Sequence, residues 1–277
     1  MTTHKVWFIT GASRGFGKLW AEAALKRGDK VAATARDPKT LDAMVAAFGK
    51  ALLPLRVDVT DHASVLEAVN LAHRKFGRLD VVLSNAGYGV MGAVEETSLA
   101  EARDAFETNV IGTLSVIQAA LPLLRGQGSG HIISVSSLAG LITFPLGGAY
   151  HAAKFAVEGL MESLAQEVAG FGIYTTLIEP GPFATEFMSE KSLKQAQQNS
   201  AYDGMRDQLM AQFNPDAFED PRRTIAAVMK IVDALRPPQH VIFGSHLPIV
   251  KKVYAARMEA WDEWAWDKIS APDSAGI

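Results

Sequence analysis

Residues 5–17 decide the fold, and they read Lys5-Val6-Trp7-Phe8-Ile9-Thr10-Gly11-Ala12-Ser13-Arg14-Gly15-Phe16-Gly17. The short apolar run over 5–10 predicts a buried strand, and the periodic stretch over 15–27 predicts a helix. The glycines between them permit a tight turn with positive φ or close backbone approach. Amides at a helix N-terminus, with the helix dipole, suit a pyrophosphate. Three glycines also fit a plain turn, but their place between strand and helix favours a dinucleotide site.

The same alternation of short apolar runs and amphipathic stretches continues along the chain. Because the strand candidates are almost continuously apolar, both faces of their sheet should be covered. Strand–helix–strand repetition predicts an α/β fold: a single Rossmann-type, doubly wound parallel sheet of about seven strands flanked by helices. We expect one dinucleotide-binding catalytic domain over 1–277. The strands are expected at 5–10, 30–35, 52–57, 79–84, 131–136, 173–178 and 240–243, and the helices at 15–27, 40–48, 61–76, 99–124 and 150–169.

Composition excludes several classes of protein. Of 277 residues, 48% are hydrophobic and 21% charged, which predicts a large core rather than disorder. The net charge of −3 gives neither a basic nucleic-acid footprint nor a polybasic membrane stripe. The absence of cysteine excludes disulfides, thiolate metal sites and a cysteine nucleophile. No signal peptide opens the chain and no apolar run reaches membrane length, so we expect a cytoplasmic protein without a membrane span or nucleic-acid partner.

One segment, 182–220, is too long for a simple loop between a strand and a helix. It is rich in Gln, Met and Phe and follows the sixth predicted strand. In doubly wound sheets ligands bind beyond the carboxyl ends of the strands, where this segment must begin. We therefore expect a substrate lid, with a variable surface insertion as the alternative.

Tyr150 and Lys154 lie four residues apart on a predicted helix and so share one face. A free tyrosine has a pKa near ~10, and a nearby ammonium lowers it by favouring the phenolate. The pair therefore predicts an acid/base group if this face lines a cleft. An exposed tyrosine beside a solvated lysine is the alternative.

Several motifs together resemble the short-chain dehydrogenase/reductase family, classical type. Thr10-Gly11 with Gly15 and Gly17 matches its TGxxxGxG turn, and Asn85-Ala86-Gly87 matches its NAG motif. Tyr150 to Lys154 matches YxxxK. Pro180-Gly181 with Thr185 matches the family's segment that covers the nicotinamide. Asp58 matches the family's acidic residue that contacts the adenine. The resemblance runs from about residue 5 to 243.

This resemblance implies roles for individual residues. Ser137, thirteen residues before Tyr150, would hydrogen-bond the substrate oxygen, and Asn109 would take part in a water-linked proton relay to Lys154. Tyr150 would give or take the proton while hydride passes between nicotinamide and substrate carbon. No metal is expected, because His131, His151 and His240 lack a ligand pattern. The implied cofactor-binding residues are Gly11, Ser13, Arg14, Gly15, Phe16, Gly17, Arg36, Asp58, Val59, Asn85, Ala86, Gly87, Tyr150, Lys154, Pro180, Gly181, Phe183 and Thr185.

The end of the second strand distinguishes NADP(H) from NAD(H). A carboxylate there would accept a hydrogen bond from the ribose 2′-hydroxyl of NAD(H) and would repel the 2′-phosphate of NADP(H). That position is Ala35, Arg36 follows it, and Arg14 lies on the same side. Two guanidinium groups suit a phosphate, so we expect NADP(H). Asp37 argues against this and for NAD(H), because its carboxylate could reach the ribose if the strand ends one residue later. The remaining alternative is that Arg14 and Arg36 are solvated surface charges without a role in binding.

Closer similarity points to the 17β-hydroxysteroid and retinol dehydrogenase branch, on residues 154–164 and 33–37. It implies a lipophilic ketone, aldehyde or alcohol. An NADP(H)-sensing binding protein on the same fold, and an epimerase or dehydratase of the family, are competing hypotheses. The intact set of Ser137, Tyr150, Lys154 and Asn109 favours catalysis. Candidate pocket residues are Tyr88, Leu138, Phe144, Phe183, Phe187 and Met188.

The C-terminal tail, 247–277, has a helical pattern over 247–269 with three tryptophans. Val250, Tyr254, Met258 and Trp261 could share one face. We expect the tail to pack onto the domain, with a subunit contact or a pocket wall as the alternative. The resemblance also implies a homodimer or homotetramer formed through long helices, where small residues permit close contact: Ala152, Ala153, Ala156 and Gly159.

Overall fold

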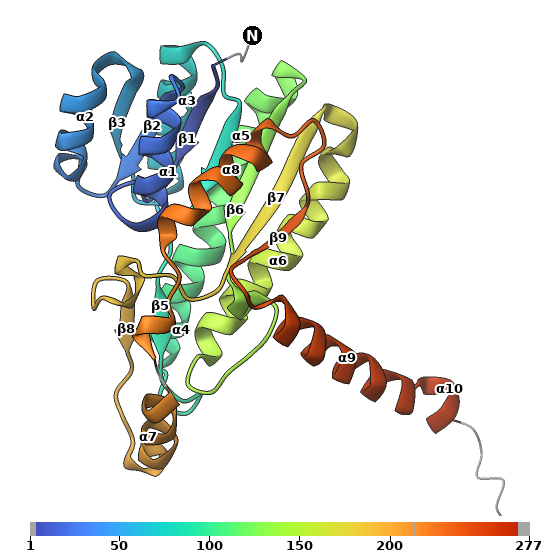
Figure 1. The fold of residues 1–277 in the computed structure, drawn as a ribbon. Coiled ribbons are helices and arrows are strands. Elements are labelled where there is room, and N and C mark those ends of the chain that lie inside the picture. Colours follow the sequence, from blue (N-terminus) through green and yellow to red (C-terminus); the bar gives the residue numbers. More distant parts are fainter. Residues whose placement is uncertain (1–3, 213, 271–277) are drawn as a thin grey trace, which may run out of the picture.

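The computed structural model of the chain describes residues 4–212 and 214–270. Its main sheet is wholly parallel, with strand order β3-β2-β1-β4-β6-β7-β9 (Figure 1). This order reverses beside β1, which creates the crevice where nucleotides bind in such sheets. The predicted fold class is therefore confirmed. The strands are β1 (Val6–Ile9), β2 (Lys30–Ala35), β3 (Leu52–Arg56), β4 (Val81–Ser84), β6 (Gly130–Val135), β7 (Ile173–Pro180) and β9 (His240–Phe243).

Helices cover both faces of this sheet, as the continuous apolar strands predict. One core lies under α3 (His62–Phe76), α5 (Gly112–Gln127) and α6 (Gly148–Val168). The other lies under α1 (Gly15–Lys26), α2 (Asp42–Phe48) and α8 (Thr224–Asp233). Side chains of one strand alternate between these cores, since Phe8 packs in the first and Trp7 and Ile9 in the second.

The single helix expected over 99–124 is interrupted. It consists of α4 (Leu99–Phe106), a π-helical turn (Glu107–Ile111) and α5. Asn109 explains the interruption, because its side-chain amide donates to the Ala105 carbonyl oxygen at 2.8 Å. A regular α-helix would use that carbonyl for the backbone amide of residue 109, so the turn widens.

The segment 182–220 leaves the sheet and returns to the same point. Glu219 N donates to Pro182 O (3.2 Å) and Ala184 N to Glu219 O (2.9 Å), which closes its base. Its strand β8 (Leu193–Gln195) pairs in parallel with β5 (Gly89–Met91). Helix α7 (Asp203–Gln212) follows beyond this small sheet (Figure 1). The sequence pattern did not predict β5, β8, α7 or α8 (Thr224–Asp233). Residue 213 lies outside the described part of the chain.

The tail forms α9 (Leu247–Glu263) and α10 (Trp266–Ile269), as the helical pattern predicts. The expectation that it packs onto the domain is wrong for most of its length: Val250 is the one buried residue of α9. Figure 1 shows both helices projecting from the body. Residues 271–277 lie outside the described structure. Within the described residues, no helix is both long and apolar enough to cross a bilayer.

The small residues expected at a helix contact of α6 do not share one face. Ala153 is wholly buried in the core, so it is unavailable to another subunit. Ala152 and Gly159 are exposed, and Ala156 is half-buried. The reason is the helical period: residue 153 points at the sheet one position after the exposed residue 152.

Candidate active site

A cavity of about 830 Å³ runs along the carboxyl ends of the central strands and under the segment 182–220. It lies where ligands bind in doubly wound sheets. All the site residues predicted from the sequence line it except Gly17 and Asn109, which lie behind its wall. The five further pocket candidates, Tyr88, Leu138, Phe144, Phe187 and Met188, line it too.

The glycine turn between β1 and α1 is shaped for an anion. Gly15 has a φ of +54°, a conformation that L side chains rarely adopt. Gly17 packs so closely behind the turn that a Cβ would lie 2.5 Å from the Gly11 carbonyl oxygen. The turn therefore needs glycine at both positions, one for its backbone conformation and one for close packing. Its cavity side presents the first amides of α1.

Asn85 and Thr10 join this turn to the end of β4. The Asn85 side-chain amide donates to the carbonyl oxygens of Thr10 (2.9 Å) and Gly11 (3.1 Å). The Thr10 hydroxyl oxygen accepts from the backbone amides of Asn85 (2.9 Å) and Ala86 (3.1 Å). Because these bonds link two strand ends, they fix both loops as one wall of the cavity.

The lid segment touches the glycine turn at two polar contacts. The Gly15 amide donates to Glu186 Oε2 at 3.1 Å. The Arg14 guanidinium donates to the Lys191 carbonyl oxygen at 3.1 Å. Phe16 of the turn also packs edge-on against Phe183, with ring centroids 5.4 Å apart. In this structure the segment 182–220 therefore packs against the glycine turn.

The end of β2 presents a cation, and not a carboxylate, to the cavity. Arg14 and Arg36 both line it, as does Ala35, the last residue of the strand. Asp37 is not among the lining residues, because its carboxylate accepts from the Lys39 amide (3.1 Å) and caps the turn that follows. Asp58 lines the cavity next to Val59 while its carboxylate accepts from the Thr60 hydroxyl (2.8 Å).

A second group of cavity residues consists of Tyr150, Ser137 and Lys154. Tyr150 is 8% exposed and its ring centroid lies 5.8 Å from Lys154 Nζ. The Lys154 ammonium donates to the Val135 carbonyl oxygen at 2.9 Å. Ser137 Oγ accepts from the Ala139 amide at 3.1 Å, which fixes the serine at the end of β6. The pair is thus in a cleft, and the exposed alternative is wrong.

Burial dominates the ionisation of this pair. It raises the pKa of Tyr150 to about 12, against which a hydrogen bond from Ser137 acts. Burial also lowers the pKa of Lys154 to about 8, and the interaction with the carboxyl group of Glu158 opposes this shift. The expectation that Lys154 lowers the tyrosine pKa is therefore not met here, because desolvation of the phenolate dominates and Lys154 is not among the causes of the shift. At neutral pH Tyr150 is a neutral phenol, ready to donate a proton.

Asn109 holds the loop that leads into β5. Its Oδ1 accepts from the Tyr88 amide (3.1 Å) and its Nδ2 donates to the Tyr88 carbonyl oxygen (2.9 Å). A Cβ on Gly87 would lie 2.5 Å from Asn109 Oδ1 and 3.9 Å from Lys154 Nζ. The hydrogen bonds of the Asn109 side chain therefore go to backbone atoms, and Lys154 is a neighbour rather than a hydrogen-bond partner.

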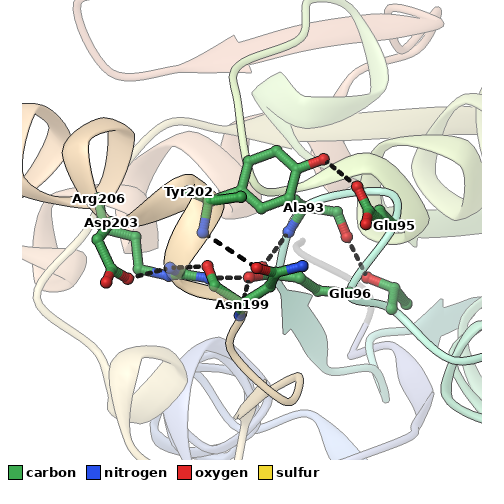
Figure 2. A network of polar contacts seen from close by, with 9 residues as sticks. Ala93, Glu95, Glu96, Asn199, Tyr202, Asp203 and Arg206 are labelled. Atoms are coloured by element: carbon green, nitrogen blue, oxygen red, sulfur yellow. Dashed lines mark hydrogen bonds and ion pairs between the residues drawn. The ribbon is translucent and has the colours of Figure 1, made fainter.

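A buried ion pair holds the segment 182–220 at α7 (Figure 2). Arg206 of α7 pairs with Glu96, whose carboxylate side chain is 1% exposed. The same carboxylate accepts from the amides of Asn199 (2.6 Å) and Ala93 (2.8 Å), and the first of these is the main cause of its lowered pKa. Tyr202 adds a hydrogen bond to Glu95 at 2.6 Å. These bonds hold the segment 182–220 against the loop that follows β5.

Some residues that line the cavity were not predicted from the sequence. They include Glu186, Lys191, Lys194 and His246, from the lid and from the loop before α9. No local motif marks them, since they reach the cavity only through long-range folding. His151 has a structural role, as expected: its ring nitrogens contact the carbonyl oxygens of Ala139 (2.9 Å) and Phe144 (3.2 Å).

Comparison with known proteins agrees with this geometry. The family model of the short chain dehydrogenases matches residues 5–196. Oxidoreductase BOA17 of Botryotinia fuckeliana is 40% identical, over 94% of this chain and 97% of that protein. The 3-ketodihydrosphingosine reductase of Bacteroides thetaiotaomicron is 36% identical, over 91% of both. Retinol dehydrogenase 8 of Homo sapiens is 32% identical, over 83% of this chain and 78% of that protein.

A solved structure is similar over nearly the whole chain. It is a short-chain dehydrogenase from Streptomyces avermitilis, with a TM-score of 0.87, 35% identity and 98% coverage of both chains. The resemblance read from the motifs, including its retinol dehydrogenase-like branch, is confirmed. The chain belongs to the short-chain dehydrogenase family and is an oxidoreductase that interconverts CH–OH and C=O groups.

Proposed function

We propose that this enzyme uses NADP(H) to interconvert a lipophilic carbonyl compound and its alcohol, with Tyr150 as the proton donor or acceptor. The observation that carries the proposal is one cavity lined by two sets of residues. Ser137 follows β6 and hydrogen-bonds Tyr150, whereas Arg14 and Arg36 follow β1 and β2, which β4 separates from β6 in the sheet. A dinucleotide spans such a separation, because its phosphates and its nicotinamide lie far apart. The chain works as one catalytic domain whose lid is the segment 182–220.

The residues present fit such a cofactor. The pyrophosphate would lie on the glycine turn, where Gly17 leaves no room for a Cβ. Arg14 and Arg36 would bind the 2′-phosphate, since guanidinium groups donate in pairs to phosphate oxygens. When bound, the cofactor supplies the hydride. The other proposed binding residues are Gly11, Ser13, Gly15, Phe16, Asp58, Val59, Asn85, Ala86, Gly87, Lys154, Pro180, Gly181, Phe183 and Thr185.

The chain's own residues handle the proton. In reduction, Tyr150 donates its proton to the substrate oxygen, and its raised pKa keeps the phenol protonated at neutral pH before the transfer. Ser137 hydrogen-bonds the same oxygen and stabilises the charge that develops there. Lys154 orients the cofactor and favours the phenolate once the proton has left. Asn109 acts as a positioning residue, through its bonds to Tyr88.

The substrate end of the cavity supports a lipophilic ligand. Aromatic and aliphatic side chains surround Tyr150, and Phe187 of the lid lies 5.7 Å from its ring centroid. Two relatives are named for a 3-ketodihydrosphingosine and for retinol, both lipids. A mainly apolar cavity with a few convergent polar groups suits such molecules.

The experiment is NADPH oxidation with a panel of ketones and aldehydes of increasing chain length. We expect turnover that rises with chain length and falls about 10²–10⁴-fold in Tyr150→Phe. Tyr174→Phe, an exposed tyrosine on β7, is the control and should leave the rate unchanged. Equal rates in Tyr150→Phe and wild type would refute the catalytic role. A panel without turnover, although NADPH binds, would favour a sensor.

A further inference from the structure

The C-terminal arm, defined here as α9 and α10, lacks the packing that normally stabilises a helix. Val250 is buried, and the guanidinium of Arg257 lies over the Phe155 ring of α6, 5.7 Å from its centroid. From Met258 to Ser270 every described residue is exposed except Ala265, which is half-buried. Because most of the stability of a helix in a protein comes from packing of its apolar face, a second surface is expected to cover the arm.

An apolar stripe runs along the exposed side of the arm. Tyr254, Met258 and Trp261 lie at helical spacing i, i+4 and i+7. Trp261, Trp264 and Trp266 are 67%, 68% and 79% exposed, and they are three of the five tryptophans in the chain. Tryptophan is enriched in the buried centre of protein interfaces and rare as an isolated exposed residue. The stripe therefore marks an interaction surface.

The charges of the arm identify the partner. Its first half carries Lys251, Lys252 and Arg257 and no acid, whereas its second half is acidic apart from Lys268. This order opposes the helix dipole, which favours acids at the N-terminus and bases at the C-terminus. Four bases and four acids cancel, unlike the basic helices that bind anionic membranes. An antiparallel copy of the same helix places each half beside its opposite charge.

Lys251 and Asp262 make this complementarity specific. Both flank the apolar stripe on the same edge, at 60° and 80° from Tyr254 on an ideal helical wheel of 100° per residue. When two identical helices pair antiparallel about a two-fold axis, the same edges of both copies face each other. Lys251 of each copy then faces Asp262 of the other.

We propose that the arms of two copies of this chain pair antiparallel, with their apolar stripes buried against each other. The contact is isologous and uses the same residues in both subunits. The arm begins directly after His246, which lines the cavity.

Charge reversal in the full chain tests the pairing by sedimentation velocity. Lys251→Glu and Asp262→Lys should each weaken assembly roughly tenfold and halve the mass at low concentration, because like charges then face each other. The double variant Lys251→Glu/Asp262→Lys should recover the wild-type mass, since each pair is restored with its signs exchanged. Lys252→Glu, which points away from the stripe, is the matched control. Failure of the double variant to recover, with both single variants folded, overturns antiparallel pairing.

Tryptophan quenching provides a second readout that does not depend on these variants. Trp7 and Trp20 are wholly buried, so acrylamide reports mainly on the arm. Pairing predicts weak quenching in concentrated wild-type protein and stronger quenching on dilution. Strong quenching at every concentration overturns the proposal. Protection that appears only on adding phosphatidylcholine vesicles, without a change of mass, shows a membrane as the occupant and overturns it too.

Discussion

The Glu186 carboxylate accepts a hydrogen bond from the Gly15 amide at 3.1 Å, across the cleft between the lid and the glycine turn. A carboxylate at the N-terminus of α1 stands where the proposed pyrophosphate would lie. Phosphate and carboxylate are both anions, so they compete for the same amide. The proposed binding mode therefore requires Glu186 to leave this amide when a dinucleotide binds.

Removing the charge of Glu186 should therefore strengthen cofactor binding. We expect Glu186→Gln to lower the Kd for NADPH about fivefold, because a charge-assisted bond in the free enzyme no longer has to break. Titration calorimetry or fluorescence enhancement of NADPH measures this. Glu190→Gln, an exposed acid of the same lid, is the control. Weaker binding in Glu186→Gln would mean that the carboxylate supports the bound state.

Arg36→Ala should weaken NADPH binding about 10–100-fold and leave NADH binding nearly unchanged, since only NADPH carries the 2′-phosphate. The readout is the ratio of the two dissociation constants. Arg56→Ala removes an exposed arginine that does not line the cavity and should not alter the ratio. Equal losses for both nucleotides would show that Arg36 does not meet the 2′-phosphate.

The Glu96–Arg206 pair should control substrate affinity through the lid. Glu96→Gln keeps the shape of the side chain but weakens its bonds to Arg206 and to the amide of Asn199. We expect KM for the substrate to rise several-fold with little change in kcat, because the anchor is remote from Tyr150. Glu95→Gln alters only the bond to Tyr202 and should have a smaller effect. A loss confined to kcat would contradict an anchoring role.

Glu158 should make stability depend on pH. Burial raises its pKa to about 8, and the neighbouring acids Glu179 and Glu162 raise it further, while Ser136 and Lys154 act against the shift. His240 faces the same cluster, with Nδ1 3.6 Å from Glu158 Oε2 and 2.8 Å from Glu179 Oε1. The folded chain thus keeps a proton that the unfolded chain loses above its ordinary pKa of 4.5.

Because the folded state binds more protons, stability contributed by this group falls as pH rises from about 4.5 to 8. The side chain in Glu158→Gln does not titrate in this pH range, so it adds no such pH dependence to the stability. The variant should therefore gain stability relative to wild type between pH 5 and pH 8, measured by urea unfolding at both pH values. Glu167→Gln, an exposed acid on the same helix, should show no such trend. A stability difference that is constant with pH would contradict the account.

Local patterns predicted the parts of the molecule that repeat or carry motifs. Apolar runs located the seven strands of the main sheet, because strands covered on both faces are almost wholly apolar. The glycine turn, Tyr150 and Lys154 were placed correctly in one cavity, since strand ends and helix faces fix their directions.

Long-range contacts account for what the sequence did not reveal. The π-helical turn at Asn109 depends on a side chain competing for the Ala105 carbonyl, which periodicity does not register. β5 and β8 are three residues each and form only by pairing across a hundred residues. The raised pKa of Tyr150 follows from burial, which spacing to Lys154 alone does not predict.

The most direct test follows the hydride and the proton together. Wild-type enzyme is mixed with NADPH deuterated at the transferred position and with the best carbonyl of the panel, and the alcohol is analysed by mass spectrometry. We predict that the deuterium appears on the former carbonyl carbon, and that Tyr150→Phe binds NADPH normally but forms the alcohol at least about 10²-fold more slowly. An alcohol without deuterium, or undiminished formation by Tyr150→Phe, would contradict the account.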